Sequence, residues 1–302
     1  MRNPVRISVV IPTWGRVQEP VRTLQDLTRQ TRLPDEIIVV DQNQPAVLEL
    51  DQVLEGIPYA RQIRASRPGV CPNYNLGWRE SRGEIVLFLD DDVELDPELI
   101  ASHLRLYDDE EKQPASAGKT KKLPLGGVAG RVEQPAGDLD PHAIVQVGKY
   151  FALTGKVIGN FNSVKPCEVQ IAPGGNMSFY RSVLEKIGGF DSGFSGNGFF
   201  FETDASLRVC EAGYRILFEP RATLKHLMAP RGGARMTDKA EHTYYFVKNG
   251  IRLYEKHSPR LGRPWFMARM ATYSAAKALW NRDPEILKKG VQAVAQSFMK
   301  SL

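Results

Sequence analysis

The stretch Glu84-Ile-Val-Leu-Phe-Leu-Asp-Asp-Asp-Val-Glu94 carries the strongest information about the fold. Its apolar run from Ile85 to Leu89 is short and rich in branched and aromatic side chains, which is typical of a buried strand. Three carboxylates, Asp90, Asp91 and Asp92, follow directly on that run. Carboxylates in such a place cost stability unless a cation lies beside them. Because ligands of open α/β sheets bind outside the carboxyl ends of strands, the stretch predicts a divalent ion and a phosphate-bearing substrate there.

Strand-like and helix-like segments alternate on both sides of this stretch. Strands are expected over residues 7–11, 36–40, 59–65, 85–89, 126–132 and 214–218, the last of them ending at Pro220. Helices are expected over residues 17–30, 47–54, 72–82, 181–187 and 201–212, from Asp96-Pro97 onward, and through most of the chain after residue 237. This alternation predicts βαβ units and an α/β fold with a mostly parallel sheet. Residues 108–124 are expected to form an exposed loop and 138–170 to be irregular.

Composition narrows the class of protein. The chain has 302 residues, of which 42% are hydrophobic and 25% charged, as in ordinary globular domains. Cys71, Cys167 and Cys210 lie far apart, which argues against a zinc site or a disulfide framework and favours a reducing compartment. No signal peptide is expected, because the N-terminus leads straight into a strand-like run. No apolar stretch approaches a membrane span of roughly 20 residues, so a cytoplasmic protein is expected.

Charge is distributed unevenly along the chain. Residues 221–302 hold 16 Lys and Arg against 5 Asp and Glu, a net charge of +11, whereas residues 1–220 hold 24 against 30, a net of −6. The basic part suits a diphosphate or an anionic lipid, and it equally suits a solvated helical surface. The segment from Arg263 to Met270 combines aromatic, methionine and arginine side chains. It is expected either to rest on an anionic membrane or to pack as a helix against the core.

Four further features could carry chemistry. Asp41 follows a strand and could accept hydrogen bonds from a ribose or a base. Glu202 and Asp204 begin a helix after three phenylalanines, which could desolvate an acid and raise its pKa for use as a general base. His226 is followed by the basic segment Arg231–Arg235, which is suited to closing over a diphosphate. Because neither GxGxxG after the first strand nor GxxxxGK[ST] occurs, dinucleotide and P-loop sites are not expected.

The ordered set of these motifs resembles the family 2 glycosyltransferases with the GT-A fold, over roughly residues 5–235. The matching stretches are Ile7–Arg16, Glu36–Asp41, Asn75–Gly77, Phe88–Asp92, Gly174–Phe179, Ile187–Asp191, Glu202–Asp204, Leu207–Arg208, Ala212–Ile216, Pro220 and His226. The resemblance implies a Rossmann-like, mostly parallel central sheet flanked by helices. It divides the chain into a GT-A domain over residues 1–235 and a basic helical extension over 236–302. The donor half of the domain spans about residues 1–130 and the acceptor half about 131–235.

The resemblance also implies roles for individual residues. Glu202 stands where the family places its catalytic base, with Asp204 as the competing candidate. Mn2+ or Mg2+ is expected on Asp92, Asp90 and His226. The residues expected to bind the nucleotide sugar are Pro12, Thr13, Arg16, Asp41, Asn75, Asp90, Asp91, Arg231 and Arg235. Those expected at the acceptor site are Asn176, Asp191 and Asn197. Two departures leave the nucleotide contacts open: Tyr74 replaces a frequent Arg, and Asp41-Gln-Asn-Gln44 replaces the usual Asp-Asp-Gly-Ser.

The implied activity is inverting, metal-dependent transfer of a sugar from a nucleotide-diphosphate sugar to an acceptor hydroxyl. Polysaccharide, glycolipid or glycoconjugate assembly is the expected setting, with a saccharide or a lipid-linked acceptor and no nucleic acid. Processive members carry membrane helices and a QxxRW motif; the sequence has neither, which favours a non-processive enzyme. Two alternatives stay open, a sugar-phosphate nucleotidyltransferase and a non-catalytic nucleotide-sugar-binding protein. The first would need a glycine-rich basic loop after the first strand, and the retained acids argue against the second.

Overall fold

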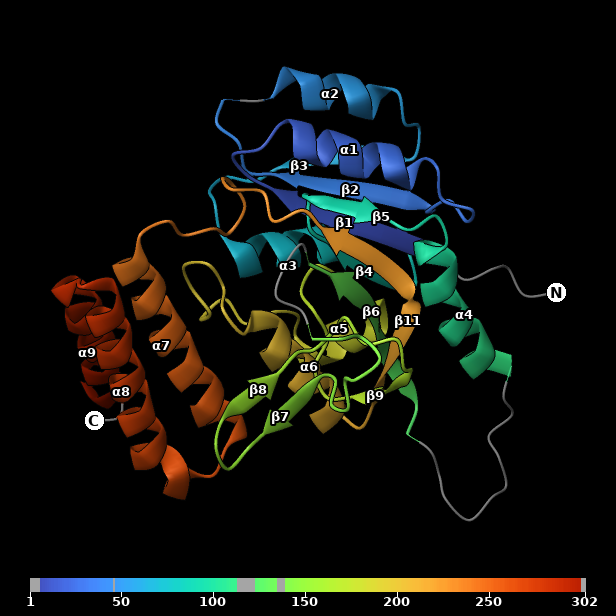
Figure 1. The fold of residues 1–302 in the computed structure, drawn as a ribbon. Helices are drawn as coiled ribbons and strands as arrows, with labels where there is room; N and C mark the ends of the chain where they lie inside the picture. Colours follow the sequence, from blue (N-terminus) through green and yellow to red (C-terminus); the bar gives the residue numbers. More distant parts are fainter. Residues whose placement is uncertain (1–5, 46, 113–122, 135–138, 300–302) are drawn as a thin grey trace, which may run out of the picture.

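A nine-stranded mixed sheet organises the chain (Figure 1). The computed structural model describes residues 6–45, 47–112, 123–134 and 139–299. Its central sheet contains β1 (Ile7–Thr13), β2 (Glu36–Asp41), β3 (Ala60–Arg64), β4 (Ile85–Leu89), β5 (Val93–Leu95), β6 (Leu125–Glu133), β9 (Cys167–Val169), β10 (Asn176–Tyr180) and β11 (Arg215–His226). The strand order is β3-β2-β1-β4-β10-β6-β11-β5, with β9 paired to β11.

The first half of the sheet is parallel, as the alternation of strands and helices predicts. β3, β2, β1 and β4 pair in parallel, and every residue of β2 and β4 is buried. The crossover helices are α1 (Gln18–Leu27), α2 (Leu48–Glu55) and α3 (Val70–Glu80). Figure 1 shows α1 and α2 on one face and α3 on the other. Alternate residues of β1 therefore enter different cores: Val9 packs on the α1 face and Val10 on the α3 face.

The second half contains antiparallel pairings. β10 runs antiparallel to both β4 and β6 and joins the two halves, whereas β6 and β11 are parallel. The prediction that the last strand ends at Pro220 is wrong. β11 continues through Pro220 to His226, and its register with β6 shifts between Glu219 and Thr223. A proline, which has no N–H, is tolerated at such an irregularity. The extension pairs with β5 and brings His226 opposite Val93, next to the acidic cluster.

The helices expected on this side form as predicted, with small shifts of their ends. They are α4 (Leu99–Lys112), α5 (Arg181–Ile187) and α6 (Phe201–Glu211). Because α4 continues to Lys112, residues 108–112 are helical and not part of the loop expected over 108–124, and residues 113–122 lie outside the described part. The segment expected to be irregular contains β9 and a hairpin of β7 (Lys149–Phe151) and β8 (Lys156–Ile158).

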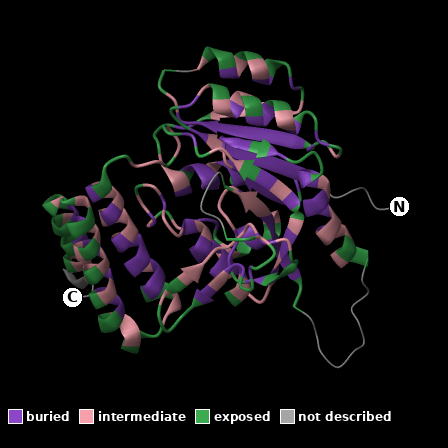
Figure 2. Cartoon of the chain, in the orientation of Figure 1, coloured by how far each residue is buried: buried purple, intermediate pink, exposed green. Residues whose placement is uncertain are grey.

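Three helices end the described chain: α7 (Lys239–His257), α8 (Arg263–Asn281) and α9 (Pro284–Met299), with a short 3-10 turn over Arg260–Gly262. In Figure 1, α7 stands between the sheet and the α8/α9 pair. Phe266, Met267 and Met270 are buried against α7, so these three side chains pack in the core rather than rest on a membrane. Figure 2 shows the buried sheet and the exposed outer sides of the helices. None of the described helices has the length and apolarity needed to cross a bilayer.

Candidate active site

The acidic cluster follows β4 at the sheet edge, and its three carboxylates have different surroundings. Asp91 is buried, accepts a hydrogen bond from Thr13 Oγ1 at 2.6 Å and forms an ion pair with Arg16. Burial raises the pKa of Asp91 to about 6, although Arg16 and Thr13 stabilise its charged form. Asp90, by contrast, keeps 41% of its side chain exposed. Asp91 therefore holds the turn after β1 in place through buried contacts, whereas the side chain of Asp90 is partly exposed.

Asp92 connects the cluster to β11. Its Oδ2 accepts the N–H of Ala229 at 2.9 Å, and its Oδ1 lies 2.9 Å from Arg16 and 3.2 Å from His226 Nε2. Although burial opposes the effect, the hydrogen bond and charge of His226, followed by Arg16, hold the pKa of Asp92 below its usual value. His226 Nε2 also lies 3.8 Å from Asp90. The structure thus brings together residues separated by more than 130 positions in the chain.

Asp90, Asp92 and His226 have the composition of a metal site. One ligand atom from each lies within 4.8 Å of the others, as expected of groups that share a cation. Two carboxylates and an imidazole suit Mn2+, and Mg2+ accepts the same oxygens. The residues present therefore fit the expected metal. The pairing of Asp92 with Arg16 places a guanidinium directly beside that site.

The basic segment Arg231–Arg235 lies over the turn after β1. The Nε of Arg16 donates to the Arg231 carbonyl at 2.9 Å, and the Gly233 N–H donates to the Trp14 carbonyl at 2.7 Å. Gly232 has φ +76°, and an added Cβ would lie 2.7 Å from the Trp14 carbonyl oxygen, so a glycine is required there. Arg235 reaches within 3.8 Å of Asp92, and its buried Nε has no partner within the described chain. Arg231 is exposed.

Glu202 lies across from the acidic cluster, at the start of α6. Burial raises the pKa of its carboxyl to about 7. A hydrogen bond with the Glu202 backbone N–H opposes this rise, and the charge of Asp90 adds to it. Two adjacent glycines lie next to the two acids: Gly174 beside Glu202 and Gly175 beside Asp90. A Cβ on Gly174 would lie 3.8 Å from the Glu202 Cβ, and one on Gly175 would lie 2.1 Å from Asp90 Oδ2. Glu202 and the half-buried Asp90 therefore both lie next to the Gly174–Gly175 backbone.

Tyr74 is a residue of this region that the motif comparison noted only as a departure. Its ring stacks on Phe88 with centroids 5.2 Å apart, and its hydroxyl donates to the Gly174 carbonyl at 3.3 Å. Burial, and then the charges of Asp90 and Glu202, raise the pKa of Tyr74 well above its usual value. The neutral phenol therefore holds the backbone at Gly174 in place. The sequence signal for this role of Tyr74 was its position one residue before Asn75.

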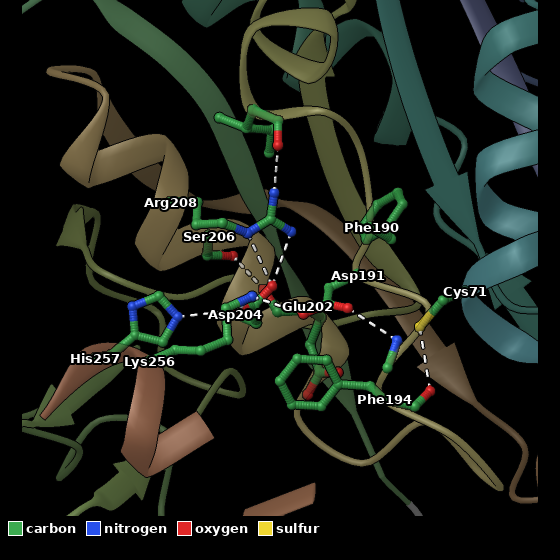
Figure 3. Close-up of polar contacts among 12 residues, drawn as sticks. Cys71, Phe190, Asp191, Phe194, Glu202, Asp204, Ser206, Arg208, Lys256 and His257 are labelled. Atoms are coloured by element: carbon green, nitrogen blue, oxygen red, sulfur yellow. Dashed lines mark hydrogen bonds and ion pairs between the residues drawn. The ribbon is translucent and has the colours of Figure 1, made fainter. Parts of the chain in front are cut away.

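Asp204, the competing base, faces the other way. It is 0% exposed and holds three cations: Arg208 at 2.8 Å, His257 at 2.9 Å and Lys256 (Figure 3). Although burial opposes the effect, the His257 hydrogen bond and the charge of Arg208 hold the pKa of Asp204 below its usual value. Lys256 and His257 belong to α7, so Asp204 fastens α6 to the C-terminal helices.

Three residues expected to contact ligands are engaged in the interior. Asp41, whose side chain is 0% exposed, accepts hydrogen bonds from Asn43, Gln62 and Arg64. Asn75 binds both backbone groups of Phe190. Asn176 is 0% exposed; it donates to the Arg131 and Ala222 carbonyls, and its Oδ1 contacts His103. In this arrangement the three side chains position backbone around the site instead of presenting free groups to it.

The remaining expected residues lie near the end of β1 and in the loop between α5 and α6. Pro12 is half-buried near the end of β1. Asp191 pairs with Arg252 and Lys256 of α7, each at 2.7 Å, and accepts the Gly193 N–H. Asn197 is half-buried and accepts the Phe199 N–H at 3.4 Å. Two of the three expected acceptor residues, Asp191 and Asn197, thus stand in the loop between α5 and α6, and Asp191 is already paired.

The sequence of this chain is similar to those of known glycosyltransferases. Residues 8–188 match the model of the family described as "Glycosyl transferase family 2". The chain is 30% identical over 88 residues to the uncharacterized glycosyltransferase YwdF of Bacillus subtilis (strain 168), a match that covers 29% of this chain and 33% of that protein. The chain thus matches about a third of the length of this curated relative.

Solved structures resemble the fold over most of the chain. The mannosyltransferase PcManGT from Pyrobaculum calidifontis, in complex with GDP-Man and Mn2+, aligns with a TM-score of 0.57 at 17% identity, over 98% of this chain and 76% of that one. S. aureus TarS 1-349, in complex with UDP-GlcNAc, aligns with a TM-score of 0.59 at 13% identity, over 96% and 81%. The GT-A-like fold expected from the motifs is confirmed. By its match over residues 8–188, the chain belongs to glycosyl transferase family 2.

Proposed function

We propose that the protein transfers a sugar from a nucleotide-diphosphate sugar to an acceptor hydroxyl with inversion at C1. One observation carries the proposal: the acid Glu202, with a pKa of about 7, borders the same region as the half-buried Asp90. A base with a pKa near the working pH both accepts a proton well and is available in its charged form. Donor and acceptor chemistry would therefore meet at the Gly174–Gly175 pair.

Glu202 supplies the base in this mechanism. Its carboxylate takes the proton of the acceptor hydroxyl while that oxygen forms a bond to C1 of the sugar. The bond from C1 to the diphosphate oxygen breaks, and its electron pair leaves with the nucleoside diphosphate. Direct displacement inverts the anomeric centre. Charge develops at C1 as in glycoside hydrolysis, so the carboxylates nearby also favour the transition state.

The donor half is proposed to bind the diphosphate between the acidic cluster and the basic segment. Asp90, Asp92 and His226 would hold Mn2+ or Mg2+, which when bound neutralises charge on the leaving diphosphate. Arg235 brings a buried guanidinium nitrogen without a partner in the described chain, suited to a diphosphate oxygen. Arg16 keeps Asp91 and Asp92 charged and oriented, and the exposed Arg231 reaches outward. PcManGT holds GDP-Man and Mn2+, which supports this donor class.

The acceptor side is proposed to lie along the Gly189–Gly198 loop, near Asp191 and Asn197. A saccharide or lipid-linked hydroxyl is the proposed acceptor, in polysaccharide, glycolipid or glycoconjugate assembly. The domain arrangement belongs to the same proposal: donor half over residues 1–130, acceptor half over 131–235 and helical extension over 236–302. The ion pairs of the half-buried Asp191 and the buried Asp204 with α7 support a close attachment of that extension.

The test is donor hydrolysis and transfer with a panel of nucleotide sugars, with and without Mn2+. Wild-type protein should release nucleoside diphosphate, and Glu202→Gln should lower turnover about 100- to 10,000-fold while donor binding, measured by calorimetry, stays within about twofold. The matched control is Glu211→Gln, which makes the same change at the exposed end of the same helix.

Each contrary result has a clear meaning. Near-normal turnover in Glu202→Gln would remove Glu202 as the base. Release of pyrophosphate in place of nucleoside diphosphate would indicate nucleotidyl transfer. Donor binding without any product from the wild-type protein would indicate a binding protein.

A further inference from the structure

The outer side of α8 presents large apolar side chains to solvent. Trp265 is 74% exposed, Leu279 80% and Trp280 89%, and Leu261 just before the helix is 94% exposed. The other exposed residues of α8 are Pro264, Ala268, Thr272 and Ala276. None of the exposed residues of this helix carries a charge. The spacing from Trp265 through Ala268, Thr272 and Ala276 to Leu279 is that of one helix face.

The neighbouring helix α9 extends this surface. Leu287 is 40% exposed and Val291 49%, and their spacing of four places both on one side of α9. α8 and α9 lie in close contact, because a Cβ on Gly290 would meet the Ser274 Oγ at 2.1 Å. We call the exposed apolar side chains Trp265, Leu279, Trp280, Leu287 and Val291, together with Leu261, the outer apolar face.

The inner sides of both helices are occupied by α7. Tyr273 and Phe266 of α8 pack on Phe246 and Tyr254 of α7, with ring centroids 4.9 and 4.3 Å apart. On α9, Gln296 accepts a hydrogen bond from Tyr244 of α7 at 2.7 Å. Leu279, Leu287 and Val291 lie on the sides of their helices turned away from these contacts. Figure 1 likewise shows α8 and α9 beyond α7 as seen from the sheet. The outer apolar face is therefore not needed to close the core.

The surroundings of this face are basic. Residues 258–302 hold eight Lys and Arg against two Asp and Glu, a net charge of +6. Arg260 and Arg282 are exposed beside the apolar side chains, as is Lys288, which pairs with Glu285 at 3.1 Å. Tryptophans at the boundary of an apolar surface, flanked by cations, suit the headgroup region of a bilayer. A second copy of the chain would bring a like positive charge against this one, whereas anionic headgroups complement it.

We propose that the outer apolar face docks the protein, without spanning, on a bilayer that contains anionic lipid. The two tryptophans and the leucines enter the interface, and the surrounding arginines and lysines contact lipid phosphates. The segment from Arg263 to Met270 contributes through Trp265, because its other large apolar side chains are buried. Docking does not depend on the transfer reaction, so the two proposals are tested separately.

The experiment is co-sedimentation of the whole chain with phosphatidylcholine vesicles that contain phosphatidylglycerol, and with vesicles of phosphatidylcholine alone. Binding is expected only to the first kind and should weaken as salt rises. Leu279→Glu and the double variant Trp265→Ser/Trp280→Ser should each lower partitioning about tenfold or more. Val145→Glu is the matched control, because Val145 is 91% exposed but lies outside the C-terminal helices. Circular dichroism and melting temperature show that each variant is folded.

Three outcomes would overturn the proposal. The first is no binding to the anionic vesicles. The second is binding that survives both variants, which would place the contact elsewhere. The third is a concentration-dependent dimer that Leu279→Glu abolishes, since the face would then be a self-association surface. Donor hydrolysis measured on the same variants keeps this result distinct from that of the catalytic proposal.

Discussion

Glu202, the proposed base, is buried in a way that is unfavourable for stability. Its carboxyl lies among protein atoms near the negative Asp90, and no cation contacts it within the described chain. Burial without a cationic partner disfavours the charged form, so the group holds its proton up to a pH of about 7. Such a perturbed acid, placed beside a second acid at a sheet edge, is typical of a functional site.

The pH dependence of turnover follows from this pKa. A general base acts only when deprotonated, so kcat should rise with pH through about 7 and then level off. The measurement is a kcat profile over pH 5 to 9 at saturating donor and acceptor. Replacement by aspartate should keep a rising limb at lower amplitude. A wild-type profile flat across this range would show that no group of this pKa limits the reaction.

The same shift predicts an effect on stability. The folded pKa of Glu202 lies above its ordinary value of 4.5, so the folded state binds more protons than the unfolded state between about pH 4.5 and 7. The contribution of Glu202 to stability is therefore lost as pH rises through this window. Glu202→Gln removes the charge, so its gain in unfolding free energy over wild type should be larger at pH 8 than at pH 5. Urea unfolding of both proteins at both pH values measures this difference.

Single residues were predicted from the sequence with uneven success. The acids at the end of β4 could be recognised, because an apolar run followed by carboxylates is a local pattern. The proximity of Asp92 and His226 was expected only from the family resemblance, since no local pattern reports a contact that depends on β5 pairing with the far end of β11. Asn176 matched a motif, yet its amide binds carbonyls of two distant strands, and no local pattern reports that.

At the scale of elements, α6 separates the two acids that looked equivalent in the sequence. Residues two apart on a helix point about 200° apart, so Glu202 and Asp204 face opposite sides. Glu202 faces the glycine pair, and Asp204 faces α7, where Lys256 and His257 meet it (Figure 3). One helix therefore carries a proposed catalytic group on one side and its own attachment on the other.

Asp204→Asn tests this division. The change leaves Arg208, Lys256 and His257 around a buried neutral amide, so unfolding free energy should fall by about 3 kcal/mol in urea titrations. The rise of kcat near pH 7 should persist, because Glu202 is intact. Glu211→Gln is the control: Glu211 pairs with the same His257 but is exposed, so its loss should cost less than about 1 kcal/mol. Unchanged stability together with abolished turnover would instead make Asp204 the base.

Apart from the five-residue β10, the strands that sequence patterns missed share a physical cause. β5, β7, β8 and β9 have three residues each, too few for alternation to be detected. β11 runs past Pro220, which as a local signal ends a strand, because its neighbours β6 and β5 support it on both sides of the irregularity. The longer helices and the parallel strands were predicted correctly because their periodicity is internal to each segment.

At the scale of the whole molecule, ion pairs and aromatic packing bind the C-terminal helices to the rest of the chain. Asp191 pairs with Arg252 and Lys256 of α7; although burial opposes the effect, Lys256, the Gly193 N–H and Arg252 hold the pKa of Asp191 at about 2. Asp204 shares Lys256. Phe199 and Phe200 pack on Phe246 with centroids 5.4 and 5.3 Å apart. The boundary at residue 235 is therefore a boundary in sequence, while the packing continues across it.

A chain that ends at residue 235 should fold poorly for this reason. It would leave Asp204, 0% exposed, with Arg208 alone and Asp191 without its cations, and buried charges that lose their partners cost several kcal/mol. Its unfolding free energy should fall by more than about 3 kcal/mol in urea titrations.

A chain that ends at residue 262 keeps α7 and both ion-pair sets but uncovers Val247, Ile251 and Tyr254. It should lie between the two in stability and bind a hydrophobic dye. If the shorter chain unfolded at the same urea concentration as the full chain, residues 236–302 would be an independent addition, and α7 would have no part in holding Glu202 in place.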